Sequence, residues 1–144
     1  MKKISTYFLA TGLLLAIFLT SCGGSGNGGG GGILSKSPSD VVKASINDLK
    51  DQKFSDVIKY FIRKDGVTFT KQDTAKMTGI CTMAYKDAES KKGIKEVQII
   101  EEKIAPDGIN ASVKYKLLFN NGTDNKTDAT FRKVNGEWLM IIGG

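Results

Sequence analysis

The feature that most limits the fold of this chain is a glycine tract: eight of the ten residues from 23 to 32 are glycine, with Ser25 and Asn27 between them. Such a segment has no apolar side chain to bury, so the tract predicts a flexible tether instead of a helix or strand. A hydrophobic core can form only from the roughly 110 residues that follow, which is the size of one small domain.

The segment before the tract has the order of an export signal. Lys2 and Lys3 precede an uncharged apolar run over residues 7–19, which is shorter than the ~20 residues that a membrane-spanning helix needs. The next residues, Leu19-Thr20-Ser21-Cys22, resemble a bacterial lipoprotein cleavage box, which implies that Cys22 becomes the lipid-bearing first residue. We therefore expect a signal peptide over residues 1–21, the lipidated cysteine and its flexible tether over residues 22–36, and a folded domain over residues 37–144.

The tether also suggests where the domain lies in the cell. A glycine-rich coil of roughly 15 residues has a mean reach of about 20 Å, so the domain can stand off the bilayer that holds its lipid. Acidic residues directly after the lipidated cysteine resemble surface-export signals of some Gram-negative lipoproteins, and none follow Cys22. This favours a lipid anchor in the outer membrane facing the periplasm, with the cell surface as the open alternative.

Composition excludes several classes of function. Loss of Lys2 and Lys3 with the signal peptide leaves 19 of the 21 basic residues against 15 acidic ones, and these charges alternate along the chain, so no nucleic-acid site is expected. The chain has no histidine, which removes histidine-activated serine and cysteine nucleophiles and imidazole zinc sites. We predict no catalytic residue, no metal and no cofactor. After lipidation of Cys22, Cys81 is the one remaining thiol, so no intrachain disulfide can form.

Three helices are predicted in the first half of the domain. Ser37 and Asp40 form a capping box with Pro38 at the first helical position, and a second helix is expected from Phe54 to Phe61, with a stop near Asp65-Gly66. A short strand is expected over residues 67–70. The third helix then opens at Thr70 and ends near residues 91–93; its expected buried positions are Met77, Ile80, Cys81, Ala84 and Ala88.

The second half reads as an antiparallel meander. Strands are predicted over residues 95–104, 109–119, 126–134 and 137–142, and the Asn135-Gly136 pair between the last two is a strong two-residue hairpin signal. This turn fixes the pairing, which places Lys133 opposite Trp138, Phe131 opposite Met140 and Ala129 opposite Ile142 on the inner face.

The opposite face of this sheet is expected to carry apolar residues as well. They are Ile100, Leu118, Leu139 and Ile141, and together they suggest a contact surface for a partner protein or a second copy of the chain. The alternatives are scattered single apolar residues, or a bulge near Ile99-Ile100 that exchanges the two faces of the first strand.

Three stretches carry a resemblance to a known family. They are the helix start at residues 37–42, the link Asp51-Gln52-Lys53-Phe54-Ser55-Asp56-Val57, and the hairpin Val134-Asn135-Gly136-Glu137-Trp138, and they resemble a domain-of-unknown-function family of small Bacteroidota-type lipoproteins. The resemblance implies the cone fold of the nuclear-transport-factor-2-like (cystatin-like) superfamily: an α+β domain with three N-terminal helices packed on a curved antiparallel sheet of four main strands and one short strand. Enzymes of that superfamily use pocket Asp, Tyr or His, and no such position can be matched here.

The cone fold implies a pocket between the inner face of the sheet and the helices. The residues expected to line it are Tyr85, Tyr115, Phe131, Trp138 and Met140, whose aromatic and thioether groups suit a small apolar ligand and equally suit a filled core. Separately, Asp73-Thr74-Ala75 resembles the acceptor triplet for O-glycosylation in Bacteroidota envelope proteins, which implies a modification site at Thr74; a plain first-turn position of the helix is the alternative.

These observations favour a non-catalytic, lipid-anchored binding or protein-interaction module of the cell envelope. The partners expected are the membrane, through the lipid on Cys22, a small apolar ligand or an envelope protein, and a second copy of the chain. One alternative is a structural spacer with a filled core. A histidine-free isomerase or hydrolase that uses carboxylate and tyrosine groups is the other.

Overall fold

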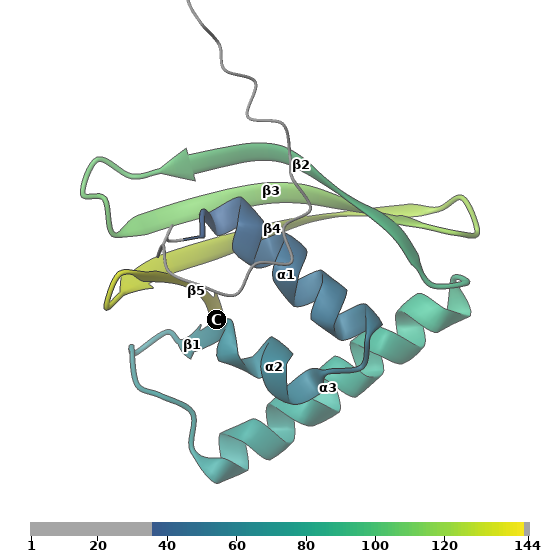
Figure 1. The fold of residues 1–144 in the computed structure, drawn as a ribbon, viewed down its shortest axis with the longest axis horizontal. Helices are drawn as coiled ribbons and strands as arrows, with labels where there is room; N and C mark the ends of the chain where they lie inside the picture. The colour runs from purple at the N-terminus through teal and green to yellow at the C-terminus, as the bar shows by residue number, and fades with distance from the viewer. Residues whose placement is uncertain (1–35, 143–144) are drawn as a thin grey trace, which may run out of the picture. The chain divides into compact units, whose positions relative to one another are not determined.

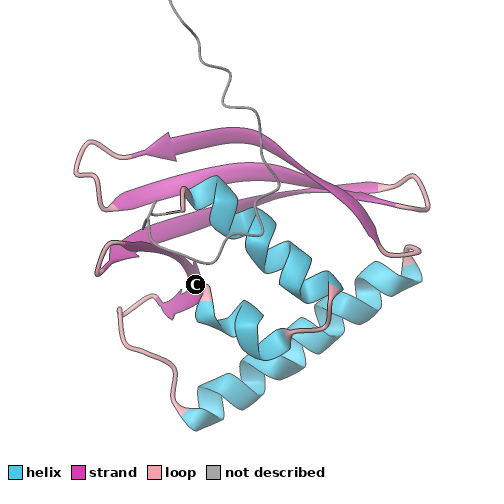
Figure 2. Cartoon of the chain, viewed as in Figure 1, coloured by secondary structure: helices cyan, strands magenta, loops and turns pink. Residues whose placement is uncertain are grey.

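The computed structural model describes residues 36–142, and the predictions for the signal peptide, Cys22 and the tether lie outside them. Three helices cover one face of a curved five-stranded sheet (Figures 1 and 2). The elements are α1 (Pro38–Lys50), α2 (Phe54–Lys59), β1 (Phe61–Arg63), α3 (Lys71–Ser90), β2 (Ile94–Ile104), β3 (Asn110–Phe119), β4 (Asp124–Val134) and β5 (Glu137–Ile142). The predicted α+β class, with one short and four main strands, is confirmed.

The strand order across the sheet is β1-β5-β4-β3-β2. All neighbours are antiparallel except β1 and β5, which run parallel with Phe61 beside Met140. The last strand therefore lies inside the sheet, between β1 and β4, and the two edges are the three-residue β1 and the eleven-residue β2.

Both long helices begin with capping boxes, at the predicted Ser37 and at Thr70, where the third helix was expected to open. The Ser37 hydroxyl accepts a hydrogen bond from the Asp40 N–H at 3.2 Å, while the Asp40 carboxylate accepts from the Ser37 N–H at 3.1 Å. Thr70 and Asp73 make the same reciprocal pair at the start of α3. Each box satisfies main-chain N–H groups that have no partner inside the helix, so the start of each helix could be located from the sequence.

The predicted second helix and short strand are wrong in their limits. The helix ends at Lys59, and the strand is residues 61–63, whereas residues 67–70 form no strand. The reason is tertiary: the Met140 N–H donates a hydrogen bond to the Tyr60 carbonyl at 2.8 Å, so β5 draws this segment into the sheet. Aromatic and β-branched residues such as Phe61 and Ile62 suit that conformation, and the predicted helix stop at Gly66 is instead a turn after the strand.

The hairpin register is as predicted where the structure pairs the two strands. Val134 lies opposite Glu137, Lys133 opposite Trp138, and Phe131 opposite Met140. The strand predicted to start at Ile109 begins at Asn110, and Ile109 is exposed in the turn before it.

A bulge interrupts the edge strand β2. The pairing of β2 with β3 shifts between Ile99 and Glu101, so Ile99 lies opposite Tyr115 and Glu101 lies opposite Lys114. The extra residue, Ile100, is 53% exposed. Of the alternatives left open by the sequence, the bulge near residues 99–100 is the one that the structure shows, and the side chains after it change faces relative to those before it.

The core lies between the concave face of the sheet and the helices. Phe131, Val113 and Val42 are its largest fully buried apolar side chains apart from Pro38. On α3 the predicted stripe is only partly buried: Met77, Cys81 and Ala88 are in the core, whereas Ile80 and Ala84 are exposed. These two predictions are wrong because α1 packs directly on the sheet, whereas α3 packs mainly on α2 and α1. Fewer positions of α3 are therefore buried than its apolar pattern indicated. Among residues 36–142, no helix is both long and apolar enough to cross a membrane.

Candidate functional site

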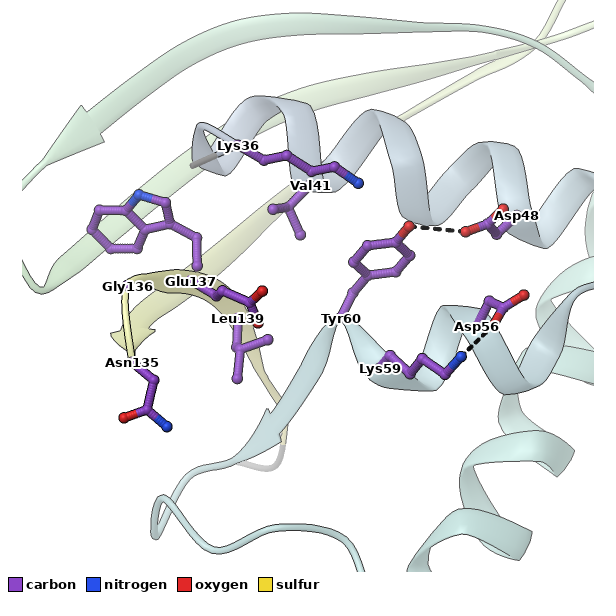
Figure 3. Close-up of a pocket in the computed structure, with 11 residues that line it drawn as sticks. Lys36, Val41, Asp48, Asp56, Lys59, Tyr60, Asn135, Gly136, Glu137 and Leu139 are labelled. Atoms are coloured by element: carbon purple, nitrogen blue, oxygen red, sulfur yellow. Dashed lines mark hydrogen bonds and ion pairs between the residues drawn. The ribbon is translucent and has the colours of Figure 1, made fainter. Parts of the chain in front are cut away.

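A large pocket lies between the helices and the tip of the β4–β5 hairpin (Figure 3). It has a volume of about 680 Å³, within the usual range for a ligand site of roughly 300–1,000 Å³. We call it the Tyr60 pocket. It is lined by Lys36, Val41, Asp48, Asp56, Lys59, Tyr60, Asn135, Gly136, Glu137, Trp138 and Leu139.

Tyr60 is held in place by α1. Its hydroxyl donates a hydrogen bond to Asp48 Oδ2 at 2.9 Å, and Lys36 Nζ lies 5.5 Å from the centre of its ring. Burial, followed by the hydrogen bond and the negative charge of Asp48, raises the pKa of Tyr60 to about 12. Tyr60 is therefore a neutral hydrogen-bond donor throughout the physiological pH range, not a general base.

The other charges of the pocket are of two kinds. Asp56 and Lys59 form an ion pair at 2.6 Å on α2, which lowers the pKa of Asp56 and raises that of Lys59. Lys36 and Glu137 have no ion-pair partner among residues 36–142. A cation and a carboxylate thus remain available on two different walls, one at the start of α1 and one on the hairpin (Figure 3).

The hairpin supplies the apolar wall. Trp138 is only 6% exposed, and Lys133 Nζ lies 5.4 Å from the centre of its ring. Leu139 and Val41 complete the apolar lining. The two-residue turn makes this wall possible because Asn135 and Gly136 both take positive φ values of 50° and 86°, which match the twist of a tight hairpin.

A smaller cleft lies inside the cone itself. It has a volume of about 300 Å³, at the lower end of the range for ligand sites, and Tyr115, Met140, Met77, Cys81 and Phe61 are among its lining residues. Burial raises the pKa values of Tyr115 and Cys81. A buried thiol with a raised pKa holds little thiolate at neutral pH, so Cys81 packs as a small apolar group.

The five residues predicted to line a single pocket do not do so. Tyr115 and Met140 line the cone cleft, and Trp138 lines the Tyr60 pocket. Phe131 is 1% exposed and fills the core. Tyr85 lies elsewhere on α3, where its hydroxyl accepts a hydrogen bond from Gln52 Nε2 at 3.1 Å and its ring meets Phe54 edge-on.

The four residues predicted for the outer face do not form one cluster, although Leu139 and Ile141 are neighbours on β5. Leu139 lies beside Arg132 and Ile141 beside Ile62, whereas Leu118 lies next to Asp124 at the far end of β4. Ile100 is the bulged residue of β2. A partner surface on this face stays a prediction, and so does modification of Thr74, whose exposed hydroxyl donates to the Thr70 carbonyl at 2.9 Å in the first turn of α3.

Tyr60, Lys36, Lys59, Asp48 and Glu137 were not identified from the sequence. The pocket forms because α2 ends at Lys59 and β1 begins at Phe61. The sequence predicted a helix through Phe61, so Tyr60 was not expected at the end of a helix. The signal that could have found it is the run Tyr60-Phe61-Ile62, which has the composition of a strand directly after a short helix.

Helices gathered on the concave face of a curved, unclosed sheet, with a pocket at the hairpin end, define an NTF2-like fold. A crystal structure described as a "Putative NTF2-like transpeptidase" from Campylobacter jejuni has this arrangement: its TM-score is 0.62 at 22% identity, over 74% of this chain and 98% of that one. The chain belongs to the family described as Domain of unknown function (DUF4878), which matches residues 28–141.

A second solved structure is similar at a lower level. The solution structure of a SEC-C motif containing protein from Rhodopseudomonas palustris is 11% identical over 76% of this chain and 78% of that one, with a TM-score of 0.49. Among curated proteins there is no match.

Proposed function

We propose that this protein is a lipid-anchored lipoprotein of the cell envelope whose NTF2-like domain is a non-catalytic binding module. The observation that carries the proposal is the Tyr60 pocket: its volume, its two aromatic side chains and its available Lys36 and Glu137 are the features of a site that orients a ligand. The cone cleft is less than half as large. A ligand in the cleft is therefore the weaker alternative, although it is the site where a small apolar molecule would fit.

The anchor rests on the sequence. The order of basic residues, apolar run and Leu19-Thr20-Ser21-Cys22 supports cleavage before Cys22 and its lipidation, and the lack of acidic residues after it supports a periplasmic orientation at the outer membrane. A Cys22→Ala variant is expected to lose its membrane attachment on cell fractionation. Equally firm attachment of the variant to the membrane would contradict the anchor.

Binding is the better assignment than catalysis because of the groups that face the pocket. Tyr60 is neutral at physiological pH with its hydroxyl bound to Asp48, and Asp56 is paired with Lys59. The activity in the name of the Campylobacter jejuni structure belongs to that protein, and at 22% identity only its fold is carried over.

Native mass spectrometry of the lipidated protein, purified gently from its own membranes, tests this function. We expect a bound mass on the wild type that is lost from a Tyr60→Ala variant and kept by a Tyr85→Ala variant. The two changes are matched, because each removes a half-buried tyrosine with one side-chain hydrogen bond, but only Tyr60 lines the pocket. A wild type without any bound mass would favour the structural spacer, for which the complete burial of Phe131 in the cone is the supporting observation. The same spectra show whether the protein is a homodimer.

A further inference from the structure

The pairing between β1 and β5 stops abruptly at the Tyr60 pocket. Phe61 lies beside Met140, and the Met140 N–H donates to the Tyr60 carbonyl at 2.8 Å. The residue before Phe61 does not belong to the strand, because the Tyr60 N–H donates a hydrogen bond to the Val57 carbonyl at 3.1 Å in the last turn of α2. The first half of β5 therefore has no strand on this side within residues 36–142.

The main chain of Trp138 faces this open edge. In a strand, the N–H and C=O groups of residues two apart point to the same side, and those of Met140 point to β1. On the β4 side, Val134 and Glu137 flank the two-residue turn as a hydrogen-bonded pair. Lys133 and Trp138 are therefore a non-hydrogen-bonded pair, which exchanges no ladder hydrogen bonds. Among residues 36–142, no turn or loop residue bonds to the N–H or the C=O of Trp138, and the pairing of β1 with β5 begins only at Met140.

The N–H and the C=O of Trp138 belong to a buried residue, where main-chain groups without a hydrogen-bond partner are rare. Trp138 is a buried residue on the wall of a large pocket, and more than nine in ten buried main-chain polar groups have a hydrogen-bond partner. One donor and one acceptor on the same residue, pointing the same way from a strand edge, match the donor and acceptor of another extended chain.

We propose that the Tyr60 pocket receives an extended peptide segment of another envelope protein, which pairs with the main chain of Trp138 along the line that β1 leaves vacant. This inference rests on the proposed function and names the class of ligand for that same site. Tyr60 and Leu139 offer an apolar contact for one peptide side chain. Lys36 and Glu137 offer one contact each to an acidic and a basic group of the peptide.

The first test concerns the unoccupied edge. In the full-length lipidated protein, ¹⁵N-labelled and placed in nanodiscs, the Trp138 amide should exchange its hydrogen at least tenfold faster than the Met140 amide, which is bonded to Tyr60. Equal protection of the two amides in the unliganded protein would overturn the proposal, because the Trp138 edge would then be occupied already.

The second test uses random hexapeptides displayed on phage. Peptides are selected on the wild-type protein in nanodiscs after depletion on a Lys36→Glu variant, whose change lies at an exposed position and leaves the core intact. Affinity is read from the fluorescence of Trp138, the single tryptophan of the chain. We expect binding that protects the Trp138 amide, is lost in Tyr60→Ala and is unchanged in Tyr85→Ala. N-methylation of the peptide amide that pairs with Trp138 should weaken binding by about tenfold, the effect of one lost hydrogen bond.

The outcomes separate this inference from the function on which it rests. A non-peptide mass that native spectra show on the wild type and not on Tyr60→Ala would keep the binding module and overturn the peptide ligand. Selected peptides that tolerate N-methylation at every position would overturn the strand pairing. Failure to select any peptide, together with a bare protein in native spectra, would overturn both.

Discussion

Replacement of Phe131 by alanine should remove a large part of the stability of the domain. Phe131 on β4 is 1% exposed, with Ala111 beside it on β3 and Met140 beside it on β5. A buried aromatic side chain removes roughly 150–250 Å² from water, which at about 25 cal/mol per Å² amounts to roughly 4–6 kcal/mol. Measured costs of such truncations are about 3–5 kcal/mol, against a total of about 5–15 kcal/mol for a domain of this size.

Urea unfolding followed by circular dichroism measures this loss. We expect the midpoint to fall sharply and the melting temperature to drop by roughly 15–30 °C, since 1 kcal/mol corresponds to about 4–8 °C in a domain of about 100 residues. The control is Ile104→Ala, which truncates a side chain that is 52% exposed and should change stability by less than about 0.5 kcal/mol. A loss below about 1 kcal/mol for Phe131→Ala would refute the packed concave face.

Three further predictions follow from caps and from titrating groups. Thr70→Ala should lower the free energy of unfolding by about 1 kcal/mol, because it removes the N-cap of α3. The control is Thr78→Ala, an exposed change inside the same helix, which should be neutral or stabilising by a few tenths of a kcal/mol. Equal losses for the two variants in urea unfolding would argue against the cap. The raised pKa of Tyr60 stabilises the fold below pH 10, and this contribution should fall as the pH rises from 10 through about 12, so unfolding free energies should decline more steeply in the wild type than in Tyr60→Phe. In a Cys22→Ser variant the Cys81 thiol should react with a disulfide reagent at pH 8 at least tenfold more slowly in the native than in the urea-unfolded protein; similar rates would contradict its burial and raised pKa.

Local signals were sufficient for most of the fold. The capping boxes at Ser37 and Thr70 and the Asn135-Gly136 turn each act within a few residues, so the starts of α1 and α3 and the register of β4 with β5 could be predicted. Along β3, Ala111 and Val113 are buried at alternate positions, because a strand with one face on the core repeats every two residues.

Long-range pairing accounts for what the sequence did not reveal. The end of α2 is decided by Met140, eighty residues along the chain from Tyr60, whose N–H competes for the Tyr60 carbonyl. No local pattern encodes that contact, and the Tyr60 pocket is its consequence. In the same way, the exposure of Ile80 depends on how α3 crosses α1 and α2, which a helical periodicity alone does not specify.

The position of β5 inside the sheet has a consequence for the order in which the domain folds. Because this strand separates β1 from β4, residues 61–63 cannot complete the sheet, and Trp138 and Met140 cannot complete the core, until the last strand of the domain has been delivered. Contacts of such long sequence separation form late in folding. In the export that we propose, a chain emerging from a secretion channel would therefore stay short of its native state until almost the whole domain has emerged.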